Sequence, residues 1–299
     1  MKNTIMYYYK LIDPTIYKKN NKIYVKTKNN VYIFEKVYKE KNIIEIFNLP
    51  KNGKYYQFVP NIFNHIITPY KNEKYVLLKL NQTNKKDILT EIIQTPQHTI
   101  PQNIHLDINH SDWKTLWSQK NDYLEYQMKH IYGKYPLIDE SFDYFLGMAE
   151  TAINYLEYNR INSRKKQEYI TICHRRINDK DFYNPLEIVL DYKERDIGEY
   201  IKYLFINNKY NNKELEKIID QLRYYNIDEY RLFARILYPS YYFDIYDRVI
   251  NNEVSETEIK KIVNRIEEYE NYIFKIFTYL SKNTQMPSIE WIKKRPENY

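Results

Sequence analysis

The sequence predicts an α+β protein with two lobes: a small N-terminal antiparallel sheet lobe with one helix, and a larger, mainly helical C-terminal lobe. The chain has 299 residues, which corresponds to two lobes at about 150 residues each. Apolar and polar residues alternate with the period of strands in the front of the chain, and recur at helical spacing further on. We therefore divide the chain into a β-rich lobe (1–80), a linker or crossing segment (81–110) and a helical lobe (111–299).

The composition is that of a folded protein with a sizeable core. Hydrophobic residues make up 43% and charged residues 28% of the chain, which excludes a disordered protein. The one cysteine, Cys173, excludes a disulfide framework and a cysteine-based metal cluster. The chain has neither a run of apolar residues long enough for a transmembrane helix nor an apolar N-terminal signal. We expect no membrane association and synthesis in the cytoplasm.

The net charge of +7 is spread along the chain. Only short basic runs occur, such as Lys18-Lys19 and Arg164-Lys165-Lys166, whereas a nucleic-acid surface needs clustered lysines and arginines. A mildly basic, solvated surface is therefore the expectation. The alternative, a protein that binds nucleic acid or an acidic partner, would require a contiguous basic patch and binding that weakens strongly with salt.

Two hairpins and a helix are predicted in the N-terminal lobe. Residues 22–38 alternate around an Asn29-Asn30 turn, because Asn tolerates positive φ. Residues 39–48 have helical spacing, and a second hairpin follows over residues 66–80. The polar, proline-containing segment after them reads as a connection without regular elements.

The C-terminal lobe is predicted to hold a series of helices around two short strands. Ser111 is expected to cap a first helix, and Asp139 or Ser141 to open a second. Ser255 with Glu258 forms a capping box for a long last helix. The remaining predicted elements are strands over 169–172 and 186–190, and helices from Asp196, over 215–222 and over 232–237.

Common catalytic motifs are missing from the sequence. The four glycines lie far apart, so no glycine-rich phosphate loop is possible. His98, His105 and His110 lie close together in the connecting segment. They are read as surface histidines, because no firm element lies beneath them, with a metal site as the alternative. Cys173 and His174 are neighbours on a predicted strand and point to opposite faces, which favours a structural cysteine over a nucleophile with its base.

The segment from Tyr169 to Tyr203 has an order of elements found in a known superfamily. It reads YITICHRRINDKDFYNPLEIVLDYKERDIGEYIKY: a strand, a His-Arg-Arg loop, Asn-Pro, a second strand, Asp, and Arg-Asp opening a helix. This resembles the catalytic core of the kinase-like phosphotransferases, the superfamily of aminoglycoside phosphotransferases and choline kinases. Within it, the segment is most similar to the kinase-like spore coat proteins of endospore-forming bacteria. The resemblance implies a two-lobed protein-kinase-like fold.

The resemblance also assigns site residues. It places the metal-binding carboxylate on Asp191, a hard oxygen ligand suited to Mg²⁺ beside phosphates, and an amide ligand on Asn184. It places the catalytic loop on His174, Arg175 and Arg176. The catalytic carboxylate of the family would stand where this chain has Arg176, and an arginine cannot act as a general base.

The front lobe departs from the family pattern too. The phosphate-pairing lysine should end the strand that begins at Val31, but Glu35 stands there and Lys36 follows on the opposite face. Several parts that phosphoryl transfer needs are therefore missing or displaced. The resemblance leaves Lys36 as the nearest candidate for contact with a nucleotide.

The leading hypothesis is a catalytically inactive, kinase-like protein (a pseudokinase) that binds protein partners as a scaffold, in assembly of a spore coat, on which it would be deposited. The spore coat role comes only from the resemblance. The alternative is an active phosphotransferase for a small molecule, with ATP and Mg²⁺ as cofactors and Asp179 or Asp181 as a substitute base. No cofactor is required by the leading hypothesis.

Structural roles are the alternative for several of these residues. Asp196 is expected to cap the helix that it opens, and His174 to hold the loop through hydrogen bonds. Arg175 and Arg176 are expected to pair with Glu194, Asp196 or Glu199, or else to bind an anion in a former phosphate cleft.

Overall fold

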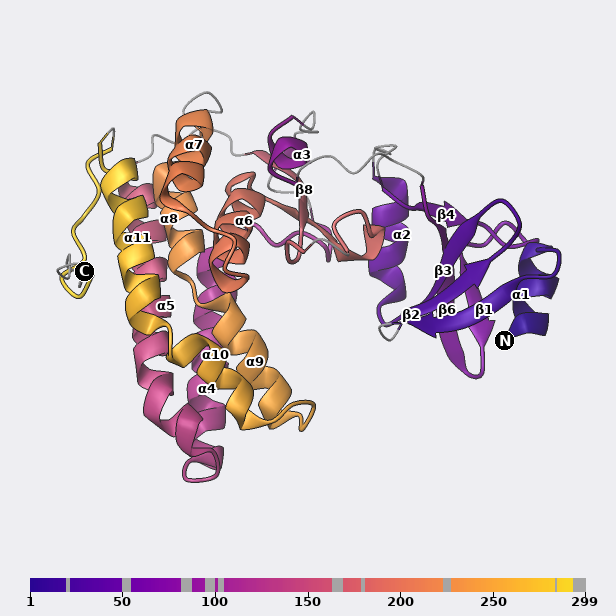
Figure 1. The fold of residues 1–299 in the computed structure, drawn as a ribbon, viewed down its shortest axis with the longest axis horizontal. Coiled ribbons are helices and arrows are strands. Elements are labelled where there is room, and N and C mark those ends of the chain that lie inside the picture. Colours follow the sequence, from indigo (N-terminus) through magenta and orange to yellow (C-terminus); the bar gives the residue numbers. More distant parts are fainter. Residues whose placement is uncertain are drawn as a thin grey trace.

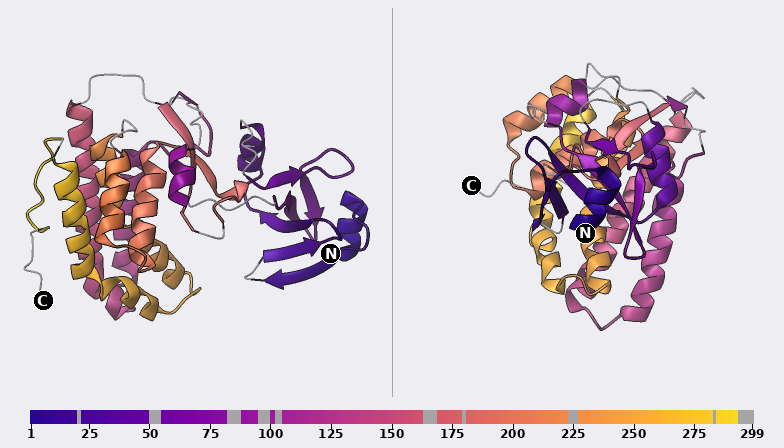
Figure 2. Two further views of the ribbon diagram at one scale, coloured as in Figure 1. Left: turned by 45° about the horizontal axis from the view of Figure 1, so that its top comes forward. Right: turned by 90° about the vertical axis from the view of Figure 1, so that its right-hand side faces the viewer.

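A computed structural model describes residues 1–19, 22–49, 55–81, 88–94, 100–101, 105–162, 169–178, 181–222, 227–282 and 284–292. The molecule is elongated, with a sheet lobe at one end and a helical lobe at the other (Figure 1; Figure 2). The N-terminus lies in the sheet lobe, and the described end of the chain lies beside α11 of the helical lobe (Figure 1). Within the described residues, no helix combines the length and apolar character needed to cross a membrane.

The N-terminal lobe is built on one antiparallel sheet. Its strand order is β1-β2-β3-β6-β4, and β5 also pairs with β6. The hairpins predicted over 22–38 and 66–80 are confirmed as β2–β3 and β5–β6. The strands are β1 (Thr15–Lys19), β2 (Lys22–Lys26), β3 (Val31–Val37), β4 (Gln57–Val59), β5 (Ile67–Tyr70) and β6 (Glu73–Lys79).

Both faces of this sheet are covered. Alternate residues of β3 and β6 point to opposite faces, so that Phe34 and Leu77 pack with Ile5 of α1 (Lys2–Tyr9). Val76 and Leu78 pack with Ile43 of α2 (Glu40–Asn48) on the other side. The lobe therefore holds two helices instead of the one predicted. The first helix was missed because only two of its residues are buried, too few to give a periodic pattern.

The connecting segment has more regular structure than its sequence suggests. It contains α3 (Ile88–Gln94) and β7 (Ile100–Pro101). β7 pairs with β8 (Tyr169–His174), which pairs in turn with β9 (Ile188–Asp191), all antiparallel. A single 3₁₀ turn, η1 (Pro185–Glu187), leads into β9. The two predicted strands are thus confirmed, the second starting two residues later than expected.

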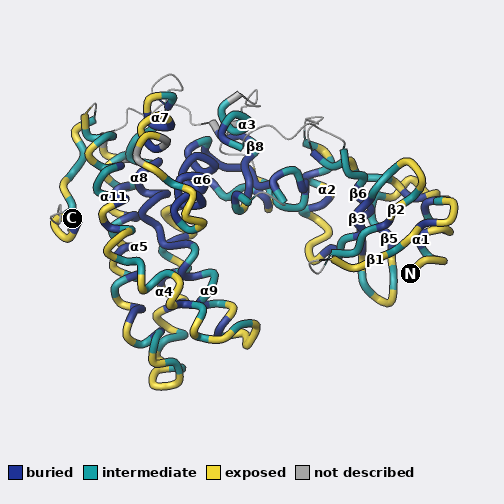
Figure 3. Tube along the Cα trace, in the orientation of Figure 1, coloured by how far each residue is buried: buried dark blue, intermediate teal, exposed yellow. Residues whose placement is uncertain are grey.

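The C-terminal lobe is a helical bundle whose centre is α6. Every residue of α6 from Glu194 to Phe205 is buried, and buried chain concentrates on α6 and α8 (Figure 3). The helices are α4 (Trp113–Ile131), α5 (Pro136–Asn162), α6 (Glu194–Ile206), α7 (Asn212–Leu222), α8 (Glu229–Leu237), α9 (Ser240–Ile250), α10 (Lys260–Val263) and α11 (Ile266–Leu280), with the 3₁₀ turn η3 (Glu256–Ile259).

Several predicted helix starts are wrong by a few residues. Asp112, not Ser111, caps α4 by accepting from the Thr115 amide at 3.3 Å. The helix α5 begins at Pro136, because proline fits the first turn, where its missing N–H is not needed. The predicted last helix is divided into η3, α10 and α11. α9 was not predicted.

α6 and α8 approach each other closely at Gly198. A Cβ atom at this position would lie 2.8 Å from Cγ and 3.0 Å from Cβ of Arg235. Arg235 is 3% exposed, so these near-backbone atoms have no room to move aside. A glycine in α6 therefore allows a buried arginine of α8 to lie against the helix.

Gly198→Ala is expected to lower the free energy of unfolding by about 1–3 kcal/mol, because the added methyl group overpacks the contact with Arg235. Gly147→Ala is the matched control, since a Cβ at this position in α5 would meet no atom within 4 Å. The control should be neutral or stabilising by about 0.5–1 kcal/mol. Urea denaturation followed by circular dichroism measures both variants, and equal effects would contradict the close approach.

Candidate functional site

The loop after β8 is held by His174, which is buried beneath it. The His174 Nδ1 donates to Asp196 Oδ2 at 2.7 Å, and the His174 backbone amide donates to Asp196 Oδ1 at 2.8 Å. The Tyr55 hydroxyl lies 3.3 Å from Nε2, and Phe182 stacks on the ring. The structural role expected for His174 fits this geometry. Asp196 does not cap α6, whose N-cap residue is Lys193; it lies in the first turn and holds His174 instead.

Arg176 is fixed in the loop by a bidentate ion pair. Its Nε and Nη2 donate to the two carboxylate oxygens of Asp244 in α9 at 2.7 and 2.8 Å. Of the three partners expected for this arginine, Glu199 lies 4.0 Å from Nη1. Asp244 was not foreseen as a partner, because the helix α9 that carries it was not predicted. Arg175 is exposed, and its side chain makes no ion pair with any residue that the structure describes.

Asp191, the predicted metal ligand, ends β9 and is fully buried. Its Oδ2 accepts from Arg195 Nη1 at 2.5 Å, and its Oδ1 accepts from the Tyr192 amide at 2.7 Å. Burial raises the pKa of Asp191, and the charge of Arg195 partly offsets that effect. The buried Cys173 donates to the Asp191 and Tyr192 carbonyl oxygens, as expected of a structural cysteine.

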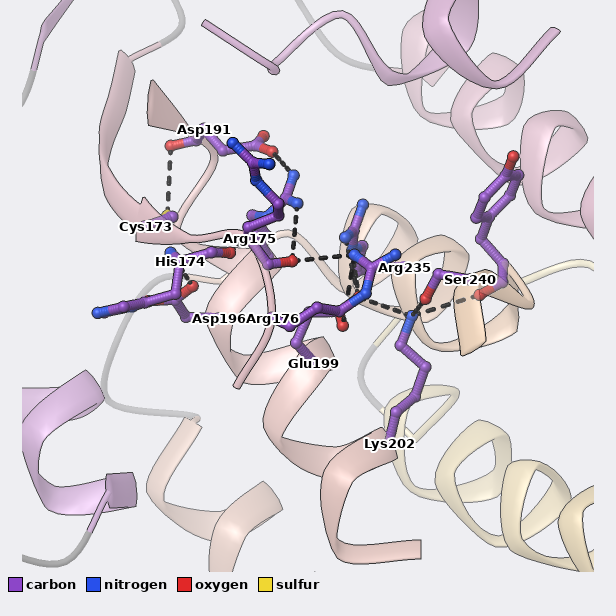
Figure 4. A network of polar contacts seen from close by, with 12 residues as sticks. Cys173, His174, Arg175, Arg176, Asp191, Asp196, Glu199, Lys202, Arg235 and Ser240 are labelled. Atoms are coloured by element: carbon purple, nitrogen blue, oxygen red, sulfur yellow. Dashed lines mark hydrogen bonds and ion pairs between the residues drawn. The ribbon is translucent and has the colours of Figure 1, made fainter. Parts of the chain in front are cut away.

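Glu199 of α6 forms ion pairs with buried cations behind this loop (Figure 4). Its Oε1 lies 2.8 Å from both Arg235 Nη2 and Lys202 Nζ. Lys202 also donates to Ser240 Oγ at 2.9 Å. Burial lowers the pKa of Lys202 to about 7, because one carboxylate shared with an arginine does not replace its hydration.

The two lobes meet through polar contacts at the position of the expected nucleotide site. Asn184 is fully buried, and its amide donates to Glu35 Oε2 of β3 at 3.2 Å. Lys22 of β2 pairs with Asp181, one of the two candidate substitute bases. Burial raises the pKa of Glu35, an effect that Lys22 partly offsets.

Of the other candidates, Lys36 lies apart from this junction. Lys36 points away from Glu35 and donates to Glu73 of β6 at 2.5 Å, with both side chains partly exposed. Asp179 lies outside the described residues. His110 is not the surface histidine expected from the sequence: it is half-buried and lines a pocket beside Arg176.

The donor set does not fit a magnesium–nucleotide site. Mg²⁺ needs free carboxylate oxygens and surrounding waters, whereas Asp191 already bonds a guanidinium group and the Asn184 amide is turned to Glu35. In the described part of the chain, no group of three or more His, Cys, Asp or Glu side chains is placed to hold a metal ion. The assignments of Asp191, Asn184 and Lys36 to metal and nucleotide stay predictions.

The chain has the fold of the aminoglycoside phosphotransferases. It aligns with spectinomycin phosphotransferase in complex with ADP and spectinomycin over 93% of this chain and 96% of that one, with a TM-score of 0.55 and 13% identity. An aminoglycoside phosphotransferase from Alicyclobacillus acidocaldarius aligns over 94% of this chain and 96% of that one, with a TM-score of 0.59 and 11% identity. The likeness confirms the predicted kinase-like fold.

The chain belongs to the family described as "Spore coat putative kinase YutH", which matches residues 5–276. The Endospore coat-associated protein YutH of Bacillus subtilis (strain 168) is 25% identical over 208 residues, which cover 61% of this chain and 61% of that protein. The match thus spans less than two thirds of that relative. The resemblance found in the His-Arg-Arg segment is confirmed.

Lys202 predicts a pH dependence of stability. Its pKa is 10.5 when unfolded and about 7 when folded, so the unfolded chain binds more protons between these values. The free energy of unfolding should therefore rise with pH, by about 1 kcal/mol per unit between pH 7 and 8.5. Lys202→Met should abolish this rise, and the exposed Lys261→Met should keep it. Urea titrations at each pH measure how the free energy of unfolding changes with pH. A rise that is unchanged in Lys202→Met would refute the lowered pKa of Lys202.

Proposed function

We propose that this chain is a kinase-like protein without phosphotransferase activity, which acts by binding protein partners during assembly of the spore coat. The observation that carries the first part is Arg176, which stands two residues after His174 and is held there by both oxygens of Asp244. A permanently protonated group at this position accepts no proton from a substrate hydroxyl.

The neighbouring contacts support the same proposal. Phosphoryl transfer depends on positioning and on neutralisation of phosphate charge by a lysine and by metal ions. Glu35 stands at the expected lysine position and contacts Asn184, and Arg195 pairs with Asp191. A carboxylate at the lysine position repels phosphate. The substitute base Asp181 is paired with Lys22.

The coat role rests on the family. The matching family is described as a spore coat kinase, and the Bacillus subtilis relative is named as endospore coat-associated. A kinase-like fold without transfer chemistry acts by binding, so we propose synthesis in the cytoplasm, deposition on the coat and protein partners there.

Calorimetric titration with ATP tests the absence of catalysis. We expect no heat at millimolar ATP, with or without Mg²⁺, and no release of phosphate. Spectinomycin phosphotransferase serves as the positive control under the same conditions, and circular dichroism shows that the titrated protein is folded. Mg²⁺-dependent binding that is lost in Asp191→Asn would overturn the proposal and favour the active phosphotransferase.

A fluorescent fusion tests the coat role. Expressed in sporulating Bacillus subtilis without its own relative, the fusion should form a ring at the spore periphery and appear in coat extracts. The fluorescent protein alone is the control and should stay outside the coat fraction. A fusion that remains diffuse in the mother cell, although intact on a gel, would contradict deposition on the coat.

A further inference from the structure

A pocket of about 230 Å³ opens beside the loop that carries Arg176. It lies in the helical lobe, between the start of α4, the loop after β8 and the start of α9. Arg176, Arg195 and Arg235 line it from three different elements, and Asp244 is the only carboxylate in its lining among the described residues. The pocket is therefore basic, unlike the mixed surface of the chain as a whole.

The carboxylates that pair with the cations of this pocket lie mostly outside its lining. Asp191 pairs with Arg195, and Asp244 pairs with Arg176. Arg235 and the buried Lys202 share Glu199. Lys120, the fourth cation of the lining, pairs with Asp247, so the four lining cations have four carboxylate partners, and three of these lie outside the lining. Among the described residues the lining itself holds four cations and one carboxylate, and this balance of charge favours an anionic ligand.

The arginines also act on His110, which lines the pocket beside them. Burial, and to a lesser extent the positive charges of Arg195, Arg175 and Arg235, together lower the pKa of His110 to about 4. The imidazole is therefore neutral at neutral pH, so that one ring nitrogen donates and the other accepts.

One wall of the pocket is aromatic. Trp113 and Trp117 stack with ring centroids 5.2 Å apart, and Tyr238 stacks on Trp117 at 4.2 Å. Arg235 lies over both tryptophan rings, its guanidinium carbon 5.4 and 5.8 Å from their centroids. The Tyr238 hydroxyl is buried without a hydrogen-bond partner among the described residues. Aromatic walls favour a flat ligand ring.

Size restricts the ligand further. A cavity of about 150 Å³ holds benzene, and drug-sized ligands need about 300 Å³ or more. The pocket, at about 230 Å³, has room for one ring with a small charged group. Guanidinium groups recognise carboxylate and phosphate oxygens in the same geometry.

We propose that this pocket binds a small anion consisting of one aromatic ring with a carboxylate or phosphate group. The oxyanion would lie toward Arg176, Arg195 and Arg235, and the ring against the tryptophan wall. The inference does not depend on the proposed loss of catalysis or on the coat role.

Ligands of similar size and different charge test whether the pocket prefers an anion. Benzoate should bind at least about tenfold more tightly than benzyl alcohol, since a charge-assisted contact is lost in the alcohol. Benzylamine should not bind. Fluorescence of Trp113 and Trp117 reports binding in a Trp291→Phe background, and calorimetry gives the Kd. Phenyl phosphate and inorganic phosphate, titrated in parallel, decide between the two oxyanions and measure the contribution of the ring.

Substitutions of Leu116 and Asp244, which line the pocket, test whether benzoate binds there. Leu116 lines the pocket and is 42% exposed, so Leu116→Glu should fold normally and weaken benzoate binding by about fivefold or more through charge repulsion. Leu116→Gln is its uncharged control and should change the Kd little. Asp244→Asn removes the carboxylate from the lining and releases Arg176, so it should tighten binding.

Three results would overturn the proposal: no binding of benzoate or phenyl phosphate at millimolar concentration, equal binding of benzylamine, or a Kd unaffected by Leu116→Glu. Turnover of ATP would refute the proposed loss of catalysis but leave the pocket's anion preference in place. The absence of benzoate and phenyl phosphate binding, with ATP also inert, would refute only the pocket.

Discussion

The polar interior of the helical lobe depends on the ion pairs of Glu199. This carboxylate is fully buried in the middle of α6, with Arg235 of α8 and Lys202 of the next turn each 2.8 Å away. Removing one partner of such a cluster leaves an uncompensated buried charge, which costs about 3–5 kcal/mol. Gly198 makes the cluster possible, because it lets the stem of Arg235 lie directly on α6.

The cluster also connects elements that are far apart in the sequence. Lys202 donates to Ser240 at the start of α9, and Arg176 reaches toward Glu199 from the loop after β8. In the kinase-like family this loop is where the catalytic carboxylate is expected. In this chain the same region holds arginines, of which Arg176 pairs with Asp244 of α9 and Arg195 pairs with Asp191 of β9. Side chains at positions of expected chemistry take part here in ion pairs and packing.

The sequence was sufficient for the fold class and for most long helices, because their apolar stripes follow a strict period. It was insufficient for α1 and β4, which bury few residues, and for α9, whose tyrosines and charges hide its periodicity. In the site, the sequence alone indicated that Glu35 stands where the kinase-like family has a lysine, and Arg176 where it has a catalytic carboxylate. It did not indicate their partners, since Asp244 and Asn184 lie far from them in the sequence and only the fold brings them close. An isolated glycine inside a helix, Gly198, was the one local signal of the close contact with Arg235.

The contacts between the lobes have a mechanical consequence. Enzymes that enclose a nucleotide between two lobes separate and close those lobes in each cycle, about a hinge. Here Glu35 bonds Asn184, Lys22 bonds Asp181, and Tyr55 reaches His174 in the opposite lobe. Opening the hinge would break all three contacts together and expose the buried Asn184. These contacts therefore tie the two lobes together and oppose an opening of the hinge.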